Sequence, residues 1–275
     1  MIQQSVTHRA GLQWRTASGR SGVERKTAQE TAIGISFDGR PHTVLMASPS
    51  DLEDLAVGFT VTEGVAPYAS IAGVSLEEAE QGFLADVRLV GGRPSKARPR
   101  SLEGRSSCGL CGVQRLADAM RPMPRVESRL TVEHEAIQFA GEQMEARQSL
   151  GRATRATHAA GFARPNGEIV AVREDVGRHN ALDKLAGALM RQGIDAANGF
   201  ILVTSRCSFE MVEKTARIGA PIIVAVSAPT DLAITKAEEA HVTLIALARA
   251  DGHTIFTRPE RIVERVDATP AWEFA

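Results

Sequence analysis

The sequence contains few cysteines, three in 275 residues, which is too few for the disulfide framework of a small secreted protein. No apolar run approaches the roughly 20 residues that a membrane-spanning helix needs. Residues 1–15, MIQQSVTHRAGLQWR, lack the apolar core of a signal peptide. These absences predict a cytoplasmic protein that does not cross a membrane.

The chain also lacks an excess of charge of either sign. Its 32 Lys and Arg residues against 33 Asp and Glu residues give a formal net charge of -1. A protein that binds nucleic acid or an anionic membrane through its overall field needs a marked positive excess. We therefore expect neither nucleic acid nor a membrane as a partner, and a local site for any anion that is bound.

The chain does contain enough apolar residues for a large core, since 43% are hydrophobic and 24% charged. Length and composition predict one or two globular domains. The predicted segments, in chain order, are a flexible tail over residues 1–22, a smaller β-rich domain over 23–126, an α/β domain over 127–258 and a C-terminal tail over 259–275.

The predicted N-terminal domain begins with two strands on either side of Asp38 and Gly39, because this pair tolerates the positive φ angles of a tight hairpin. A helix is expected from Ser50, as N-cap, to Gly64. Residues 91–105 carry five basic residues, one acidic residue, three glycines and two prolines, without apolar periodicity. They predict a mobile basic loop that leads into a cysteine pair.

The second half of the chain alternates between helical and strand patterns. A helical pattern over residues 132–150 is followed by strands around Asn166 and Gly167. Residues 168–247 then alternate regularly, which predicts an α/β layer with largely parallel strands.

The cysteine pair, Cys108 and Cys111, lies in the segment SSCGLCG. The flanking glycines leave room for another molecule to approach. A thiol beside Arg105 and at the start of the helical segment that follows would have its thiolate favoured, and the thiolate is the nucleophilic form of sulfur.

A C-x-x-C pair has two other interpretations, a zinc site and a redox pair. A closed zinc site needs four ligands, but Cys207 is distant and the seven histidines show no H-x-x-x-H spacing. A thioredoxin-like redox pair normally lies between a strand and a helix, whereas this pair follows an arginine-rich loop. A swinging carrier arm fits the pattern better than either.

Two polar runs follow predicted strands. REDVGRHNALDK, residues 173–184, places His179, Asn180, Asp183 and Lys184 at the start of a helix. Ligands of open α/β sheets bind outside the carboxyl ends of the strands, so this run predicts a ligand site. A solvated turn before a capped helix would explain the same residues.

The second run is TSRCSFEMVEK, residues 204–214. Ser205, Arg206 and Ser208 would surround free backbone N–H groups at the start of a helix, which is a favourable place for a phosphate. Simple capping by Ser208 is the alternative. Cys207 is interpreted as a small, partly buried residue.

Four segments, DLAVGFTVTEG, SSCGLCG, VGRHNALDK and TSRCSFEMVEK, occur in this order. In sequence and order they resemble the FdhD family (FdhD/NarQ type), sulfur carrier proteins required for formate dehydrogenase activity. The resemblance covers residues 24–258.

The resemblance implies that the protein accepts sulfane sulfur from a cysteine desulfurase as a cysteine persulfide. It then transfers the sulfur to the molybdenum cofactor, Mo-bis(molybdopterin guanine dinucleotide), before that cofactor enters formate dehydrogenase. The persulfide would form on Cys108, and Cys111 would be the accessory thiol. The cofactor is a bound substrate here, and no intrinsic metal is implied.

The resemblance also implies where the guanine dinucleotide moiety binds. The aligned segment is Leu247, Ala248, Arg249, Ala250, Asp251 and Gly252, although the family usually has an aromatic residue in place of Leu247 and Gly in place of Ser205. Further candidate contacts are Ser205, Arg206, Ser208, His179 and Asn180. The implied fold is a C-terminal three-layer domain like that of cytidine deaminases, and the implied assembly is a homodimer.

Three rival functions remain. A binding chaperone would hold the cofactor through Arg206, His179 and residues 247–252 without sulfur chemistry. A zinc-dependent deaminase would need an H-x-E or C-x-E motif and a Pro before C-x-x-C, and neither is present. A thiol–disulfide oxidoreductase would use the cysteine pair for electron exchange.

Overall fold

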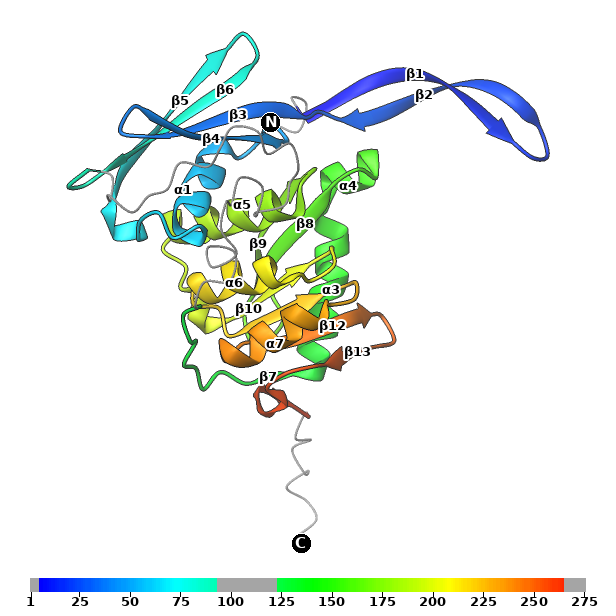
Figure 1. Ribbon diagram of the computed structural model, residues 1–275. Coiled ribbons are helices and arrows are strands. Elements are labelled where there is room, and N and C mark those ends of the chain that lie inside the picture. Colours follow the sequence, from blue (N-terminus) through cyan, green and yellow to red (C-terminus); the bar gives the residue numbers. More distant parts are fainter. Residues whose placement is uncertain (1–4, 93–122, 265–275) are drawn as a thin grey trace, which may run out of the picture.

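A computed structural model describes residues 5–92 and 123–264 of the chain. Its N-terminal unit is a four-stranded sheet covered on one face by helix α1 (Leu52–Thr62) (Figure 1). The strand order is β4-β3-β6-β5. The strands are β3 (Thr31–Phe37), β4 (Arg40–Ala47), β5 (Ile71–Ala79) and β6 (Gly82–Leu89), and a short 3-10 helix, η2 (Tyr68–Ser70), precedes β5.

The expected hairpin around Asp38 and Gly39 is confirmed. Both residues have positive φ, 51° and 73°, and they join β3 to β4. Helix α1 ends just before Gly64, as predicted, and Gly64 has a φ of 69°. Its predicted N-cap was wrong by one residue, because Asp51 rather than Ser50 occupies the cap position, with a left-handed backbone and no side-chain cap.

The N-terminal tail prediction is wrong for most of its length. Strands β1 (Val6–Arg15) and β2 (Gly19–Ala28) pair in register from Val6 opposite Ala28 to Arg15 opposite Gly19. They form a two-stranded ribbon that extends away from both sheets (Figure 1). The ribbon escaped prediction because β2 contains only two apolar side chains, Val23 and Ala28, so its sequence carries no strand periodicity.

The C-terminal unit is built on a six-stranded sheet with the order β13-β12-β11-β10-β8-β9. The strands are β8 (His158–Ala163), β9 (Ile169–Asp175), β10 (Phe200–Val203), β11 (Ile222–Ala225), β12 (Thr243–Arg249) and β13 (Gly252–Ile255). Strands β10, β11 and β12 are parallel, whereas β8, β9 and β13 join through antiparallel pairs. The sheet is therefore mixed rather than largely parallel, because the turn at Asn166–Gly167 folds β9 directly back onto β8.

Helices cover both faces of this sheet. They are α3 (His134–Arg147), α4 (Ser149–Thr154), α5 (Arg178–Arg191), α6 (Phe209–Arg217) and α7 (Asp231–Glu239). Along β10, Ile201 and Val203 pack with α5, α6 and α7, while Phe200 and Leu202 pack with α3. The fold is thus mixed α/β with three layers and a smaller β-rich N-terminal unit, as predicted. The likeness to cytidine deaminases stays a prediction.

The predicted C-terminal tail is partly ordered structure. A 3-10 helix, η4 (Pro259–Arg261), and strand β14 (Ile262–Val263) follow the sheet, and β14 pairs with β7 (Val132–Glu133). The buried Arg261 donates hydrogen bonds to the carbonyl oxygens of His241 and Val126. These contacts return the chain to the start of the C-terminal unit. A further 3-10 helix, η3 (Ala196–Asn198), precedes β10. Among the helices that the structure describes, none is long and apolar enough to cross a membrane.

The two units meet where α1 crosses α5. Gly58 on α1 lies against the backbone of Asp183 and Gly187, and Gly187 on α5 lies against the backbone of Asp54. A Cβ atom at either glycine would overlap a backbone carbonyl group, Asp183 in the first case and Asp54 in the second. The glycines therefore let the two helix backbones touch directly.

This contact predicts that Gly58→Ala and Gly187→Ala each lower the free energy of unfolding by about 1–3 kcal/mol or more, since neither backbone can yield without separating the units. Gly141→Ala is the matched control, because Gly141 is exposed on α3 with open space around it. That control should be neutral or stabilising by up to about 1 kcal/mol. Equilibrium denaturation measures all three, and equal effects at positions 58 and 141 would contradict the prediction.

Candidate functional site

One edge of the six-stranded sheet gathers most of the polar residues that the sequence singled out. Strands β9, β10, β11 and β12 all end at this edge, and β8 begins there because it runs antiparallel to β10. Adjacent strands lie about 4.8 Å apart, so the ends of β9 and β12 are separated by about 19 Å. A ligand that contacts both must be extended.

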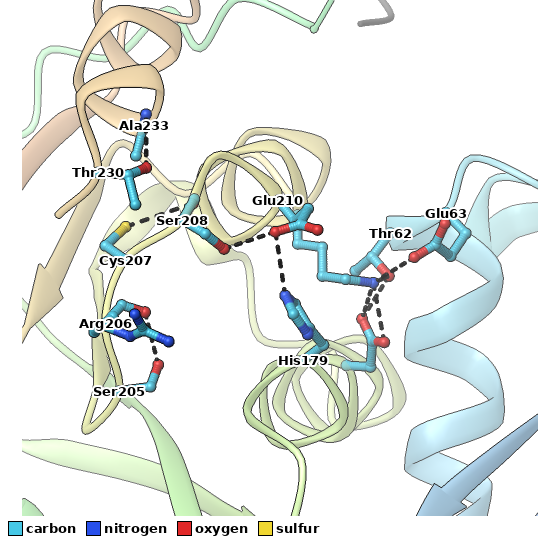
Figure 2. Close-up of polar contacts among 12 residues, drawn as sticks. Thr62, Glu63, His179, Ser205, Arg206, Cys207, Ser208, Glu210, Thr230 and Ala233 are labelled. Atoms are coloured by element: carbon cyan, nitrogen blue, oxygen red, sulfur yellow. Dashed lines mark hydrogen bonds and ion pairs between the residues drawn. The ribbon is translucent and has the colours of Figure 1, made fainter. Parts of the chain in front are cut away.

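The loop between β10 and α6 holds Ser205, Arg206 and Ser208 at the middle of this edge (Figure 2). Arg206 is exposed, while Ser205 is buried and its hydroxyl donates to the Arg206 carbonyl oxygen at 3.0 Å. Ser208 occupies the N-cap position of α6 without capping it, and its hydroxyl donates to Glu210 Oε2 at 2.7 Å. Capping by Ser208 is therefore not what fixes this loop.

The loop after β10 is fixed instead by backbone hydrogen bonds to the loop that follows β11. The amide of Cys207 donates to Ala228 at 3.3 Å, and the amide of Thr230 donates to Cys207 at 3.0 Å. Thr230 in turn caps α7 by accepting from the Ala233 amide. The loops that follow β10 and β11 thus form one rigid rim, with Arg206 projecting from it.

The start of α5 adds His179 and Arg178 to the same edge. His179 is only 4% exposed, and neither ring nitrogen makes a hydrogen bond, although Nε2 lies 3.5 Å from Glu210 Oε2. Nε of Arg178 is also buried without a hydrogen-bond partner. His158, at the start of β8, lies close enough that burial first, and then the charges of Arg178 and His179, lower its pKa.

Buried polar atoms without partners are uncommon in folded proteins, and each costs free energy. Here they occur together with two arginines and two histidines at the edge where α/β sheets bind ligands. The arrangement is suited to an anionic ligand with hydrogen-bonding groups, such as a phosphate or pyrophosphate.

The segment Leu247–Gly252 joins β12 to β13 at the other side of the edge. Leu247 has a φ of 54° and is 43% exposed, and its amide donates to the Ser227 carbonyl oxygen at 3.3 Å. A bulge between Ala246 and Arg249 interrupts the pairing with β13. Ala248 is half-buried, Arg249, Ala250 and Asp251 are exposed, and Gly252 has a φ of 152°.

The bulge turns the Leu247 side chain out of the sheet instead of into the core. An exposed apolar side chain at a strand end is suitable for packing against a planar ring, although leucine provides less stacking surface than an aromatic residue. The expected role of residues 247–252 in holding a guanine base stays a prediction.

Asn180 has a different environment from His179. Its amide donates to the Met46 carbonyl oxygen at 2.8 Å and to Asp175 at 3.0 Å, and the side chain is buried. Both amide donations thus bind α5 to the N-terminal unit and to β9. The structure assigns Asn180 a role within the fold, and its predicted contact with the cofactor remains untested.

Lys184 and Asp183 are likewise engaged inside the protein. Lys184 Nζ lies 2.6 Å from Asp175 Oδ2 and donates to the Ser48 carbonyl oxygen at 2.9 Å, with Lys184 and Asp175 both fully buried. The Ser48 amide donates to the same carboxylate at 2.9 Å. This group anchors the segment between β4 and α1 to the end of β9.

Asp183 belongs to a second buried group, of which Figure 2 labels Thr62 and Glu63. Lys214 Nζ donates to Asp183 Oδ1 at 2.8 Å and to Glu63 Oε1 at 2.8 Å, and Thr62 donates to Asp183 at 2.6 Å. Burial lowers the pKa of Lys214, but the two carboxylates raise it by more, so the net shift is upward. Lys214 is therefore a fixed positive charge that ties α6 to α1 and α5.

Cys207 is buried among the core residues of the sheet. Burial raises the pKa of its thiol to about 12. This confirms the interpretation of Cys207 as a small packing residue. Cys108 and Cys111, and the basic loop before them, lie outside the residues that the structure describes, so their proposed roles rest on the sequence.

Sequence reasoning did not single out two parts of this edge. His158 opens a strand that otherwise reads HAAGFA, and one histidine before an apolar run carries no motif. The loop after β11, residues 226–230, contains only small residues and one proline, and its role as a rim becomes visible only through pairing with Cys207.

Comparison with known proteins supports a single family. The model of the FdhD/NarQ family matches residues 28–263 of this chain. A sulfur carrier protein FdhD from Agrobacterium fabrum is 46% identical over 244 residues, covering 87% of this chain and 90% of the relative. The protein of the same name from Cupriavidus necator is 44% identical, covering 86% of this chain and 83% of the relative.

A solved structure is similar over nearly the whole fold. It is a crystal structure from Desulfotalea psychrophila described as a formate dehydrogenase accessory protein, with a TM-score of 0.74 and 25% sequence identity. The match covers 94% of this chain and 99% of the other. Matching sequence, fold and motif order together show that this chain belongs to the FdhD/NarQ family.

Proposed function

We propose that this protein is a cytoplasmic sulfur carrier that serves formate dehydrogenase. It accepts sulfane sulfur from a cysteine desulfurase as a persulfide on Cys108. It then transfers the sulfur to Mo-bis(molybdopterin guanine dinucleotide) before that cofactor enters the enzyme. Curated relatives carry the name sulfur carrier protein, and the similar solved structure is described as a formate dehydrogenase accessory protein.

The observation that carries the proposal is the polar edge of the six-stranded sheet. Its buried His179 ring nitrogens and Arg178 Nε make no hydrogen bond, and Arg206 is exposed on the neighbouring rim. These donors fit the pyrophosphate of a dinucleotide. Residues 247–252, about 10 Å away from Arg206 across two strand spacings, then lie at a suitable distance for its guanine.

The chemistry of loading requires a reactive thiolate. The Cys108 thiolate attacks the outer sulfur of the desulfurase persulfide, a sulfur–sulfur bond forms, and the desulfurase cysteine leaves as a thiolate. No net oxidation occurs. Cys207 is unsuited to this step, because its thiol is buried and its pKa is raised to about 12. Of the three cysteines, this leaves Cys108 and Cys111.

Cys111 gives a route for release. Its thiolate attacks Cys108 Sγ, the terminal sulfur leaves as sulfide, and a Cys108–Cys111 disulfide forms. The two electrons that reduce the sulfane sulfur come from the two cysteines. A cellular thiol reductant must then reduce the disulfide before the next cycle.

The proposal predicts the fate of each cysteine variant. Incubated with a cysteine desulfurase and cysteine, the full chain should gain the mass of one sulfur atom, and a reductant should remove it. Cys108→Ser should abolish the gain, whereas Cys207→Ser, the matched control, should retain it. Intact mass spectrometry reads the result. A gain that persists in Cys108→Ser would refute the assignment.

The raised pKa of Cys207 generates a separate prediction. At pH 8 about one Cys207 thiol in ten thousand is ionised, against about a quarter for an ordinary cysteine. Iodoacetamide at pH 8 should therefore leave Cys207 unmodified in the native protein and modify it after unfolding. Peptide mass spectrometry quantifies the label, and rapid native labelling of Cys207 would contradict its burial.

The polar edge predicts binding of GDP as a minimal probe of the dinucleotide. Arg206→Ala should weaken GDP binding by about tenfold or more, since a charge-assisted hydrogen bond contributes about 1.5–3 kcal/mol. Arg164→Ala is the control, because Arg164 is exposed at the turn between β8 and β9, where it pairs with Glu168. Calorimetry measures both affinities. Equal effects of the two variants would remove the support for this site.

Three measurements separate the rival functions. Formate dehydrogenase activation that survives Cys108→Ser, with GDP binding intact, would favour a binding chaperone. Reduction of insulin disulfides would favour a thiol–disulfide oxidoreductase. Stoichiometric zinc in the purified chain would favour a metal site that includes the cysteine pair.

A further inference from the structure

His179 is a buried side chain in unusual surroundings, because it is only 4% exposed and its ring makes no hydrogen bond. It lies in the first turn of α5, at the sheet edge where we place the phosphates of the dinucleotide. The two nitrogens of an imidazole point in divergent directions, so one neighbouring group cannot satisfy both. Each nitrogen therefore requires a partner of its own.

The Nε2 atom of His179 faces helix α6. It lies 3.5 Å from Glu210 Oε2, and Glu210 is itself buried (Figure 2). This distance is longer than a hydrogen bond, but a carboxylate and an imidazole that meet away from water are screened little from each other. Hydrogen bonds of a functional site are often long in the free protein and shorten when the ligand is bound. Glu210 is thus in position to hold a proton on Nε2.

Two features favour a carboxylate at position 210. The Ser208 hydroxyl donates to the same oxygen of Glu210, Oε2, at 2.7 Å. Glu210 also occupies the first turn of α6, where the positive end of the helix dipole stabilises a negative charge. The carboxylate is therefore fixed in position beside the His179 ring.

The Nδ1 atom of His179 has no hydrogen-bond partner among the residues that the structure describes. Nε of Arg178, the preceding residue, is buried without one as well. Burial, and then the charges of Arg178 and His179, lower the pKa of His158 at the start of β8. Donor groups thus gather around His179, which favours an acceptor such as a phosphate oxygen as the ligand of Nδ1.

An imidazole with an acceptor on each side carries a proton on both nitrogens, and such a ring is cationic. We infer that Glu210 is a positioning residue for the ligand: it holds a proton on Nε2 of His179, so that Nδ1–H donates to a phosphate oxygen of the bound dinucleotide. The cationic ring then separates two negative groups that would otherwise repel each other. This inference rests on the proposed dinucleotide site and adds to it the residue that sets the charge of His179.

Two roles for Glu210 predict effects of opposite sign on ligand affinity. A carboxylate that acts directly on the ligand repels its phosphates, so that removing the charge strengthens binding. A carboxylate that acts through His179 has the opposite effect, because its removal leaves a ring with one proton and one donor fewer. Glu210→Gln makes the distinction, since glutamine has the same shape and still accepts the hydrogen bond from Ser208.

Calorimetry with GDP measures this effect in the full chain. Glu210→Gln should weaken GDP binding by about tenfold, since a charge-assisted hydrogen bond is about twice as strong as a neutral one. Glu213→Gln is the matched control, because it removes a carboxylate three residues further along α6, where Glu213 pairs with Arg217. That control should leave the affinity for GDP unchanged. Circular dichroism checks that each variant is folded.

A double-mutant cycle separates positioning from a purely structural role. In a His179→Gln background, which keeps one donor at position 179, Glu210→Gln should no longer weaken GDP binding. It should instead strengthen binding slightly, because it removes a negative charge near the phosphates. A loss of affinity that persists in that background would show that Glu210 supports the fold of the site and would overturn the inference.

Nitrogen NMR of histidine-labelled protein locates the proton in the GDP complex. Protonated and unprotonated imidazole nitrogens have different chemical shifts, and the His179→Gln variant identifies the signals of His179 by their absence. Both nitrogens of His179 should be protonated in the wild-type complex, whereas one should be unprotonated in Glu210→Gln. A purely structural role for Glu210 would leave this pattern unchanged.

The outcomes distinguish this inference from the proposed function. Unchanged or tighter GDP binding in Glu210→Gln, or an unprotonated Nδ1 in the wild-type complex, would overturn the positioning role of Glu210 and leave the dinucleotide site standing. A wild type that does not bind GDP would remove the site itself, and the inference with it.

Discussion

The direct backbone contact between α1 and α5 is the constraint on which the arrangement of the two units depends. Gly58 and Gly187 allow the helices to touch, and the close approach brings buried ion pairs into reach on both sides. Lys184 meets Asp175 beside Ser48, and Lys214 meets Asp183 beside Thr62. Buried pairs of this kind contribute little net stability but are costly to break, by about 3–5 kcal/mol when one partner is lost. They therefore specify one packing of the units over its alternatives.

The backbone contact between α1 and α5 also sets the geometry of the candidate site. Helix α5 carries Arg178 and His179 in its first turn, Asn180 and Lys184 against the N-terminal unit, and Gly187 at the crossing. The position of the site residues is thus set by packing at Gly187, eight residues after His179, as well as by the sheet edge. Helix α6 is held in the same way, since Lys214 ties it to α1 while Glu210 faces His179.

The sequence predicted correctly those features that depend on residues close together in the chain. The Asp38–Gly39 hairpin, the end of α1 before Gly64 and the alternation of helices and strands after residue 168 follow from turn chemistry and periodicity. The runs that carry His179 and Arg206 were each predicted to follow a strand, where ligands of open α/β sheets bind, and the structure places both at the same edge of the sheet. The β1–β2 ribbon was missed because its second strand, with Val23 and Ala28 as its only apolar side chains, lacks an apolar alternation. The roles of Gly58, Asn180 and His158 were missed because each depends on a neighbour distant in sequence.

The contacts that α5 makes with the N-terminal unit decide which pairs of units can be combined in a chimaera. A chimaera that takes its N-terminal unit from one relative and its C-terminal unit from another receives Gly58, Ser48 and Thr62 from one parent and Gly187, Lys184 and Asp183 from the other. Each buried partner is then supplied by a different source. The two units are therefore exchangeable only when both halves of the α1–α5 crossing match, even though the candidate site residues all lie in the C-terminal unit.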